Sequence, residues 1–104
     1  MEKQDAFTQA LLRAMDAAEQ EAGVRQPRLR RAVEQYGGIS AVQELCRRGQ
    51  VSDGFDQLAE LGRLALSAEA LAVSAKFNAC FTDDEVNHCF AQLCAANYFG
   101  KARF

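Results

Sequence analysis

Apolar side chains recur along most of this chain at steps of three and four residues, and this spacing limits the folds available to it. Positions three or four apart share one face of an α-helix, whereas a strand places every second residue on the same face. The first stripe contains Phe7, Leu11, Met15 and Ala18. Helices this short are marginal alone, so their apolar faces must pack together. The spacing therefore predicts an all-α fold.

Glycines, one proline and short polar residues divide the stripes into separate helices. Gly23 is expected to end the first helix in the left-handed conformation that glycine readily adopts. Pro27 is expected in the first turn of the second helix, where its missing N–H costs nothing. The predicted segments run from about Asp5 to Ala22, from Pro27 to Tyr36, from Ile39 towards Gly49, from Ser52 or Asp53 to Gly62, from Ser67 through Phe81, and from Thr82 through Leu93.

Several helix starts carry residues that can cap a backbone N–H. Thr82 and Glu85 match the capping box, in which the Thr82 hydroxyl accepts from the Glu85 backbone and the Glu85 side chain reaches back. Ser67 is a predicted N-cap for the fifth helix, Ser40 for the third, and Ser52 or Asp53 for the fourth. These signals predict where the helices begin.

The apolar stripes predict a single domain over residues 1–104, built as a compact irregular bundle of five or six short helices. A chain of 104 residues with 49% apolar and 25% charged residues has the composition of a globular protein. The residues expected to be buried are Phe7, Leu11, Ala14, Met15, Ala18, Ala22, Leu29, Val33, Tyr36, Ile39, Val42, Cys46, Phe55, Leu58, Ala59, Leu61, Ala70, Val73, Phe77, Phe81, Val86, Cys89, Phe90, Leu93 and Tyr98.

The N-terminal residues and the cysteines predict a cytoplasmic protein. The first five residues include Glu2 and Asp5, whereas a secretory signal begins with basic residues. Polar residues interrupt every apolar run before the roughly 20 residues that a membrane span requires. We therefore expect no membrane contact and reduced thiols at the four cysteines.

The residues that could carry chemistry are few. Cys80, Cys89 and Cys94 with His88 could be considered as zinc ligands, but they lack the closely spaced ligand pairs of structural zinc sites. Cys46, Cys80 and Cys89 occupy positions on the apolar stripes, so the predicted role of the thiols is core packing. His88 is expected on a solvated helix face, with a modest side-chain pair to Asp84 or Gln92 four residues away. No phosphate-binding loop or nucleophile motif is present. We expect no enzyme activity, no catalytic residue, no cofactor, no metal and no small-molecule substrate.

Basic residues gather in the middle of the chain and form the candidate binding site. The net charge of the whole chain is −2, yet residues 23–49 contain six arginines and two glutamates, a net charge of +4. Clustered cations can contact phosphates or acidic protein surfaces. They can equally be a solvated face, or pair with the acidic first helix. The candidate residues are Arg25, Arg28, Arg30, Arg31, Arg47 and Arg48.

Four stretches carry a resemblance to known proteins. These are residues 36–41 (Tyr-Gly-Gly-Ile-Ser-Ala), 52–55 (Ser-Asp-Gly-Phe), 62–73 (Gly-Arg-Leu-Ala-Leu-Ser-Ala-Glu-Ala-Leu-Ala-Val) and 81–86 (Phe-Thr-Asp-Asp-Glu-Val). In that order they resemble an uncharacterised small helical module of bacterial proteins. Because the matching positions are helix caps and core residues, the resemblance implies a helical fold and carries over no activity.

These observations predict a non-enzymatic helical protein that acts through protein–protein interaction. The predicted role is regulatory, and self-association is one predicted form of the interaction. The aromatic and basic C-terminal tail, residues 98–104, would either close the core or anchor a partner. The alternative is a helix-turn-helix-like nucleic-acid-binding regulator that uses the arginines between Arg25 and Arg48.

Overall fold

Six α-helices and two short 3₁₀ turns make up the part of the chain that the structure describes. The computed structural model describes residues 2–96 and 98, and within them it contains no strand. The prediction of an all-α bundle of five or six short helices is therefore confirmed. The elements are α1 (Glu2–Ala22), α2 (Pro27–Tyr36), α3 (Gly38–Arg47), α4 (Phe55–Glu60), η1 (Leu64–Leu66), α5 (Ala68–Val73), η2 (Asn78–Cys80) and α6 (Asp83–Ala95).

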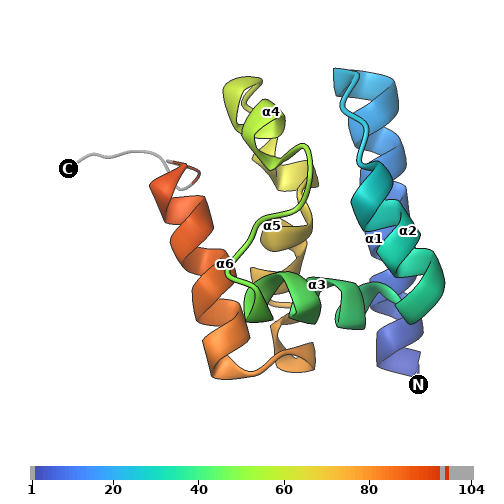
Figure 1. Ribbon diagram of the computed structural model, residues 1–104, viewed down its shortest axis with the longest axis vertical. Helices are drawn as coiled ribbons and strands as arrows, with labels where there is room; N and C mark the ends of the chain where they lie inside the picture. The colour runs from blue at the N-terminus through green and yellow to red at the C-terminus, as the bar shows by residue number, and fades with distance from the viewer. Residues whose placement is uncertain (1, 97, 99–104) are drawn as a thin grey trace.

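The helices form an irregular bundle rather than a row of parallel rods. Figure 1 shows α1 and α2 side by side at one side of the molecule and α6 at the other, with α4 and α5 between them. Helix α3 runs across this arrangement and contacts α1, α2, α5 and α6. The radius of gyration, 12.7 Å, matches the ~13 Å of a compact chain of about 100 residues.

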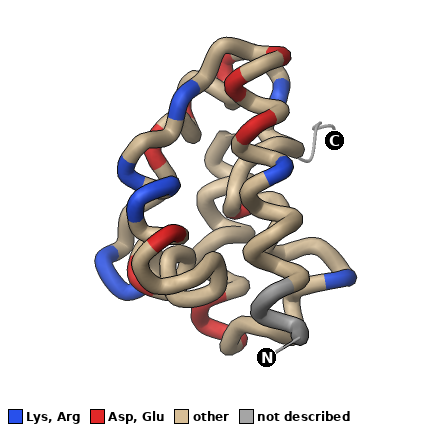
Figure 2. Tube along the Cα trace, turned by 90° about the vertical axis from the view of Figure 1, so that its right-hand side faces the viewer, with Lys and Arg blue, Asp and Glu red and all other residues tan. Residues whose placement is uncertain are grey.

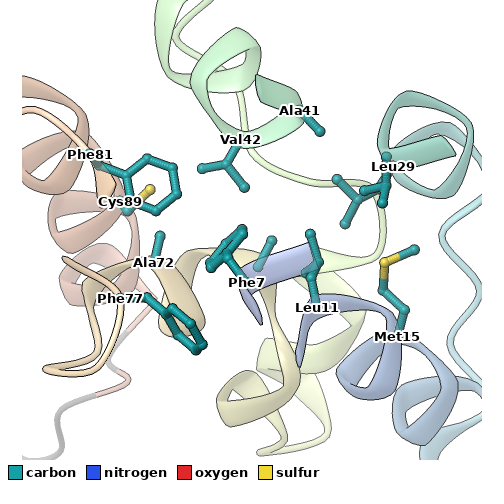
Figure 3. Packing of buried hydrophobic residues seen from close by; sticks show 12 residues of the cluster. Phe7, Leu11, Met15, Leu29, Ala41, Val42, Ala72, Phe77, Phe81 and Cys89 are labelled. Atoms are coloured by element: carbon teal, nitrogen blue, oxygen red, sulfur yellow. The ribbon is translucent and has the colours of Figure 1, made fainter. Parts of the chain in front are cut away.

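Phe7 lies at the centre of the larger of two apolar clusters. Its side chain is fully buried, and its ring centroid lies 5.2 Å from that of Phe77 and 5.2 Å from that of Phe81, both in edge-to-face geometry. Figure 3 shows these rings packed with Val42 of α3 and Leu11 of α1. Edge-to-face pairs contribute roughly 0.5–1.5 kcal/mol beyond area burial. This cluster joins α1, α2, α3, α5 and α6.

A second cluster connects the end of α1 to α4, α5 and α6. Val24, Phe55, Leu58 and Leu93 are its larger buried members, and Leu58 and Leu93 are fully buried. The two clusters together stabilise helices that would be marginal in isolation.

The crossing of α1 and α3 depends on a glycine. Gly38 is buried at the start of α3, and a Cβ added there would lie 3.0 Å from Phe7 Cδ2 and 3.0 Å from Thr8 Cα. The Gly38 N–H donates to Thr8 Oγ1 at 2.8 Å. Helix α3 therefore begins on α1 itself, and the predicted cap at Ser40 is wrong because the helix starts two residues earlier.

The other predicted caps are partly confirmed. Ser67 accepts from the Ala70 N–H at 3.1 Å, and Thr82 and Glu85 form the full capping box. The fifth helix, however, ends at Val73 and does not continue through Phe81. Ser74 has extended backbone angles and its hydroxyl donates to the Leu71 carbonyl, which ends the helix. A turn and η2 then bring Phe77 and Phe81 into the core.

Four residues predicted to be buried are exposed. Their exposed fractions are 66% for Tyr36, 55% for Leu61, 48% for Phe90 and 36% for Tyr98. Tyr36 and Leu61 lie at the ends of their helices, where the stripe leaves the core. Phe90 follows Cys89, so the helix turns it about 100° away from the buried face. The remainder of the predicted tail, residues 99–104, lies outside the described residues.

Candidate partner-binding surface on helices α2 and α3

Four of the six candidate arginines make ion pairs within the chain. Arg25 lies 3.8 Å from Glu19, and Arg30 lies 2.9 Å from Asp16, so both contact acids of α1. Arg47 and Arg48 both pair with Glu44. The hydrogen bonds that they donate lower the pKa of the Glu44 carboxyl, and the bond from Arg47 contributes most. Ion pairs exposed to solvent stabilise a fold only weakly, so these arginines can exchange partners at little cost.

Arg28 and Arg31 differ from the other four. Both are exposed on α2, and neither forms an ion pair with any of residues 6–96. Figure 2 shows basic positions following one edge of the molecule, with acidic positions interleaved. The six arginines are therefore spread over residues 25–48, from the segment before α2 to the residue after α3, and two of them form no ion pair with the described residues.

An apolar groove lies between α2, α3 and the segment that follows α3. It has a volume of about 240 Å³ and a floor of Leu29, Ala32, Ala41, Leu45 and Val51. Helices α2 and α3 pack directly against one another, and each supplies one wall of the groove. The arginines thus border an apolar surface rather than an isolated charged patch.

The rim of the groove is aromatic and charged. Tyr36, Arg28 and Arg48 border it, together with Glu44 and Asp53. The ring of Tyr36 is mostly exposed, so it can contact a bound partner without moving out of the core. Sequence reasoning missed this groove because it assigned Tyr36 to the core. A usable signal was Leu45, an apolar residue outside the predicted stripe.

The segment 50–54 is held in place by its side chains and fixes one wall of the groove. Asp53 Oδ2 accepts from the Arg28 N–H at 2.9 Å, and Asp53 Oδ1 accepts from the Leu29 N–H at 3.2 Å. Asp53 therefore caps α2 and not the helix that follows it, which corrects the prediction for α4. Gly54 is the N-cap of α4, with φ of 86° and Val24 packed against it.

Ser52 is also not a cap but the partner of a buried carboxylate. Glu69 of α5 is 2% exposed, and its two oxygens accept from the Ser52 N–H at 2.7 Å and the Ser52 hydroxyl at 2.8 Å. Burial raises the pKa of Glu69 above its ordinary value of 4.5, although the two hydrogen bonds from Ser52 act in the opposite direction. This pair anchors the segment to the centre of the bundle.

His88 fixes the start of the same segment. Its Nε2 lies 2.9 Å from the Gln50 carbonyl oxygen, which joins α6 to residue 50. From the sequence, His88 is expected to pair along a solvated face of α6; its side chain is half-buried, and its hydrogen bond reaches a residue 38 positions earlier. The geometry gives His88 a positioning role.

The four cysteines differ in exposure. Cys89 is buried, Cys46 and Cys80 are half-buried and Cys94 is exposed, so the predicted role in core packing fits Cys89 best and does not fit Cys94. Cys46 Sγ lies 3.8 Å from Cys89 Sγ. Within residues 6–96 and 98, no three His, Cys, Asp or Glu side chains are grouped to hold a metal ion.

Comparison of this chain with protein families, curated proteins and solved structures gives no match. The resemblance to a bacterial helical module therefore stays a prediction. Within the described residues, no helix is both long and apolar enough to cross a membrane. The groove and its basic rim are consequently the features from which a function can be argued.

Proposed function

We propose that this chain is a non-enzymatic interaction module, and that its α2–α3 groove binds an acidic, amphipathic segment of a partner protein. The observation that carries the proposal is an apolar floor bordered by an exposed tyrosine and by arginines. Tyrosine and arginine are enriched among the residues that dominate binding energy at protein interfaces. The proposal keeps the predicted cytoplasmic location, where free thiols persist.

The size of the groove favours a protein segment over a small molecule. Sites that enclose small ligands have volumes of roughly 300–1,000 Å³. This groove holds about 240 Å³ and is lined by residues of α2, α3 and the segment after α3. Such a surface suits apolar side chains that repeat on one face of a partner helix.

Charge favours an acidic occupant. Residues 23–49 have a net charge of +4, from six arginines and two glutamates. Asp53 is already bonded to the start of α2, and Glu44 to Arg47 and Arg48. Acidic groups of a partner in the groove would meet Arg28, which lines it and is not ion-paired with the described residues, and would also attract Arg48, which lines it as well.

Selection from a library of randomised helical peptides, displayed against the full chain, tests this proposal. We expect the enriched peptides to carry Leu or Phe at helical spacing with Asp or Glu beside them. Tyr36→Ala and Arg28→Glu should each weaken their binding by at least about ten-fold, equivalent to about 1.4 kcal/mol. Leu61→Ala and Arg13→Glu are matched controls, since both residues are exposed and neither lines the groove. Basic peptides, or equal losses in the controls, would contradict the proposal.

A nucleic-acid-binding regulator is the second candidate, favoured by Arg28 and Arg31, the two exposed arginines of α2 that form no ion pair with residues 6–96. Two observations weigh against it. Only Gly37 separates α2 from α3, whereas a helix-turn-helix uses a turn of 3–4 residues. Glu44 of α3 also pairs with both Arg47 and Arg48, so an acidic side chain lies beside these two arginines. A salt-sensitive mobility shift that is lost on replacing Arg28, Arg30 and Arg31 by Gln would support nucleic-acid binding.

A further inference from the structure

Two cysteines from different helices meet where α3 packs against α6. Cys46 lies in the last turn of α3 and Cys89 in the middle of α6, and their Sγ atoms are 3.8 Å apart. A disulfide has an S–S distance of about 2.05 Å, so the two sulfurs need to approach by roughly 1.8 Å. The two residues are 43 positions apart, so a bond between them would join distant parts of the chain.

Solvent reaches one sulfur and not the other. Cys46 is half-buried and lines a hollow of about 590 Å³ between α3 and the start of α6, together with polar residues that include Gln43, Arg47 and Glu85. Cys89 is 2% exposed and belongs to the larger apolar cluster. A small oxidant in the hollow would therefore meet Cys46 first.

The hydrogen bond between the two thiols makes their acidities unequal. A Cys89 S–H that donates to Cys46 Sγ lowers the pKa of Cys46, while the same contact and burial raise the pKa of Cys89. Partial burial and the carboxylates of Glu85 and Glu69 oppose the change at Cys46. The thiolate is the nucleophilic form. Because Cys46 lines the hollow and Cys89 is buried, Cys46 is placed as the attacking sulfur and Cys89 as the resolving sulfur.

We propose that Cys46 and Cys89 are a hydroperoxide-reactive dithiol pair that closes reversibly into a disulfide between α3 and α6. The Cys46 thiolate attacks one peroxide oxygen, the O–O bond breaks, and protonation of the leaving oxygen gives Cys46 sulfenic acid and water or an alcohol. The Cys89 sulfur then attacks Cys46 Sγ and the S–O bond breaks as the disulfide forms; the leaving hydroxide takes the Cys89 thiol proton and departs as water. The peroxide is reduced by two electrons and the two thiols are oxidised by two. A cellular dithiol returns the pair to its reduced state by thiol–disulfide exchange.

This inference does not rest on the proposed function, because no residue in the reaction lines the α2–α3 groove. It does place a covalent link on α3, the helix that contributes Leu45 and Glu44 to that groove. Oxidation would therefore act on a wall of the proposed binding surface.

The test uses the full chain with Cys80→Ala and Cys94→Ser, so that Cys46 and Cys89 are its only cysteines. Treatment with hydrogen peroxide should remove both free thiols per chain and lower the monomer mass by two hydrogens, and a reducing dithiol should restore them. Peptide mapping without reductant should identify the Cys46–Cys89 link. In the same background, Cys89→Ser should leave a sulfenic acid at Cys46 that dimedone traps, whereas Cys46→Ser should leave Cys89 unmodified in the folded chain.

The matched control is the variant Cys46→Ala with Cys89→Ala, which retains Cys80 and Cys94 and should form no intramolecular link. If the variants do not fold, peptide mapping of the unmodified chain after the same treatment gives the answer. Oxidation confined to Cys94, or disulfides only between chains, would overturn the proposal. A sulfinic acid at Cys46 without a bond to Cys89 would overturn it as well.

Discussion

Replacing Asp53 by alanine removes the carboxylate that accepts from two backbone N–H groups in the first turn of α2. Both groups, at Arg28 and Leu29, lack acceptors within their own helix, as do all N–H groups at a helix start. The residue that flanks α2, Gln26, provides no side-chain cap. Asp53 is therefore the cap of α2 although it lies 25 positions from Arg28.

The expected cost of Asp53→Ala follows from these contacts. Loss of an N-cap typically costs about 0.5–2 kcal/mol, and loss of an acid near a helix N-terminus about 0.3–1 kcal/mol. Because water can reach the freed Arg28 N–H, we expect the total to stay near 2 kcal/mol. For a domain of this size, such a loss lowers Tm by roughly 8–16 °C.

Chemical denaturation of the two proteins measures this difference, and hydrogen exchange at the Arg28 and Leu29 amides locates it. Asp53→Asn keeps one acceptor and should lose less stability than Asp53→Ala. Glu60→Ala, an exposed acid at the end of α4, serves as the control and should change the free energy of unfolding by less than about 0.5 kcal/mol. If Asp53→Ala matches this control, or the two amides exchange as in the original chain, the capping argument is refuted.

Three further predictions concern the packing and charge of the bundle. Gly38→Ala should destabilise the fold by about 1–3 kcal/mol in denaturant unfolding, because the new Cβ meets Phe7 and Thr8 at 3.0 Å. A gain of stability, as helix propensity alone predicts, would contradict the close contact of α1 and α3 at this glycine. Thr82→Ala should cost about 1 kcal/mol by removing the α6 capping box, and an unchanged unfolding curve would show that this cap contributes nothing. Glu69→Gln should alter the pH dependence of stability. Since the folded chain holds the Glu69 proton more tightly, its stability relative to Glu69→Gln is greatest below pH 4.5 and falls as pH rises through the raised pKa. If the stability of the original chain relative to Glu69→Gln instead rises with pH, the upward direction assigned to the pKa of Glu69 is wrong.

The sequence predicted the features that depend on neighbouring residues. Ser67 and the Thr82–Glu85 box act over three positions, and Gly23 has the expected positive φ of 69°. The stripe of α1 was also predictable, because its buried residues follow the helical period. These signals are local, so they needed no knowledge of the tertiary fold.

The contacts that shape the candidate site could not be predicted in this way. Asp53 has the sequence position of a cap for α4, yet the fold uses it at α2. The pairs Ser52–Glu69 and Cys46–Cys89 join positions 17 and 43 apart. Tyr36 lies on the apolar stripe of α2, yet it is exposed because it is the last residue of that helix, where the stripe leaves the core. Such features require the packing of whole helices.

The central claim is that a partner contacts α2, α3 and the segment 50–53. Backbone amide chemical shifts of the unmodified, reduced chain, followed during titration with an acidic peptide from the selection, test it most directly. We expect the shifted amides to include Arg28, Ala32, Leu45 and Val51, and the shifts to weaken as salt is added. Shifts confined to α1 or α6, with α2 and α3 unchanged, would contradict the claim.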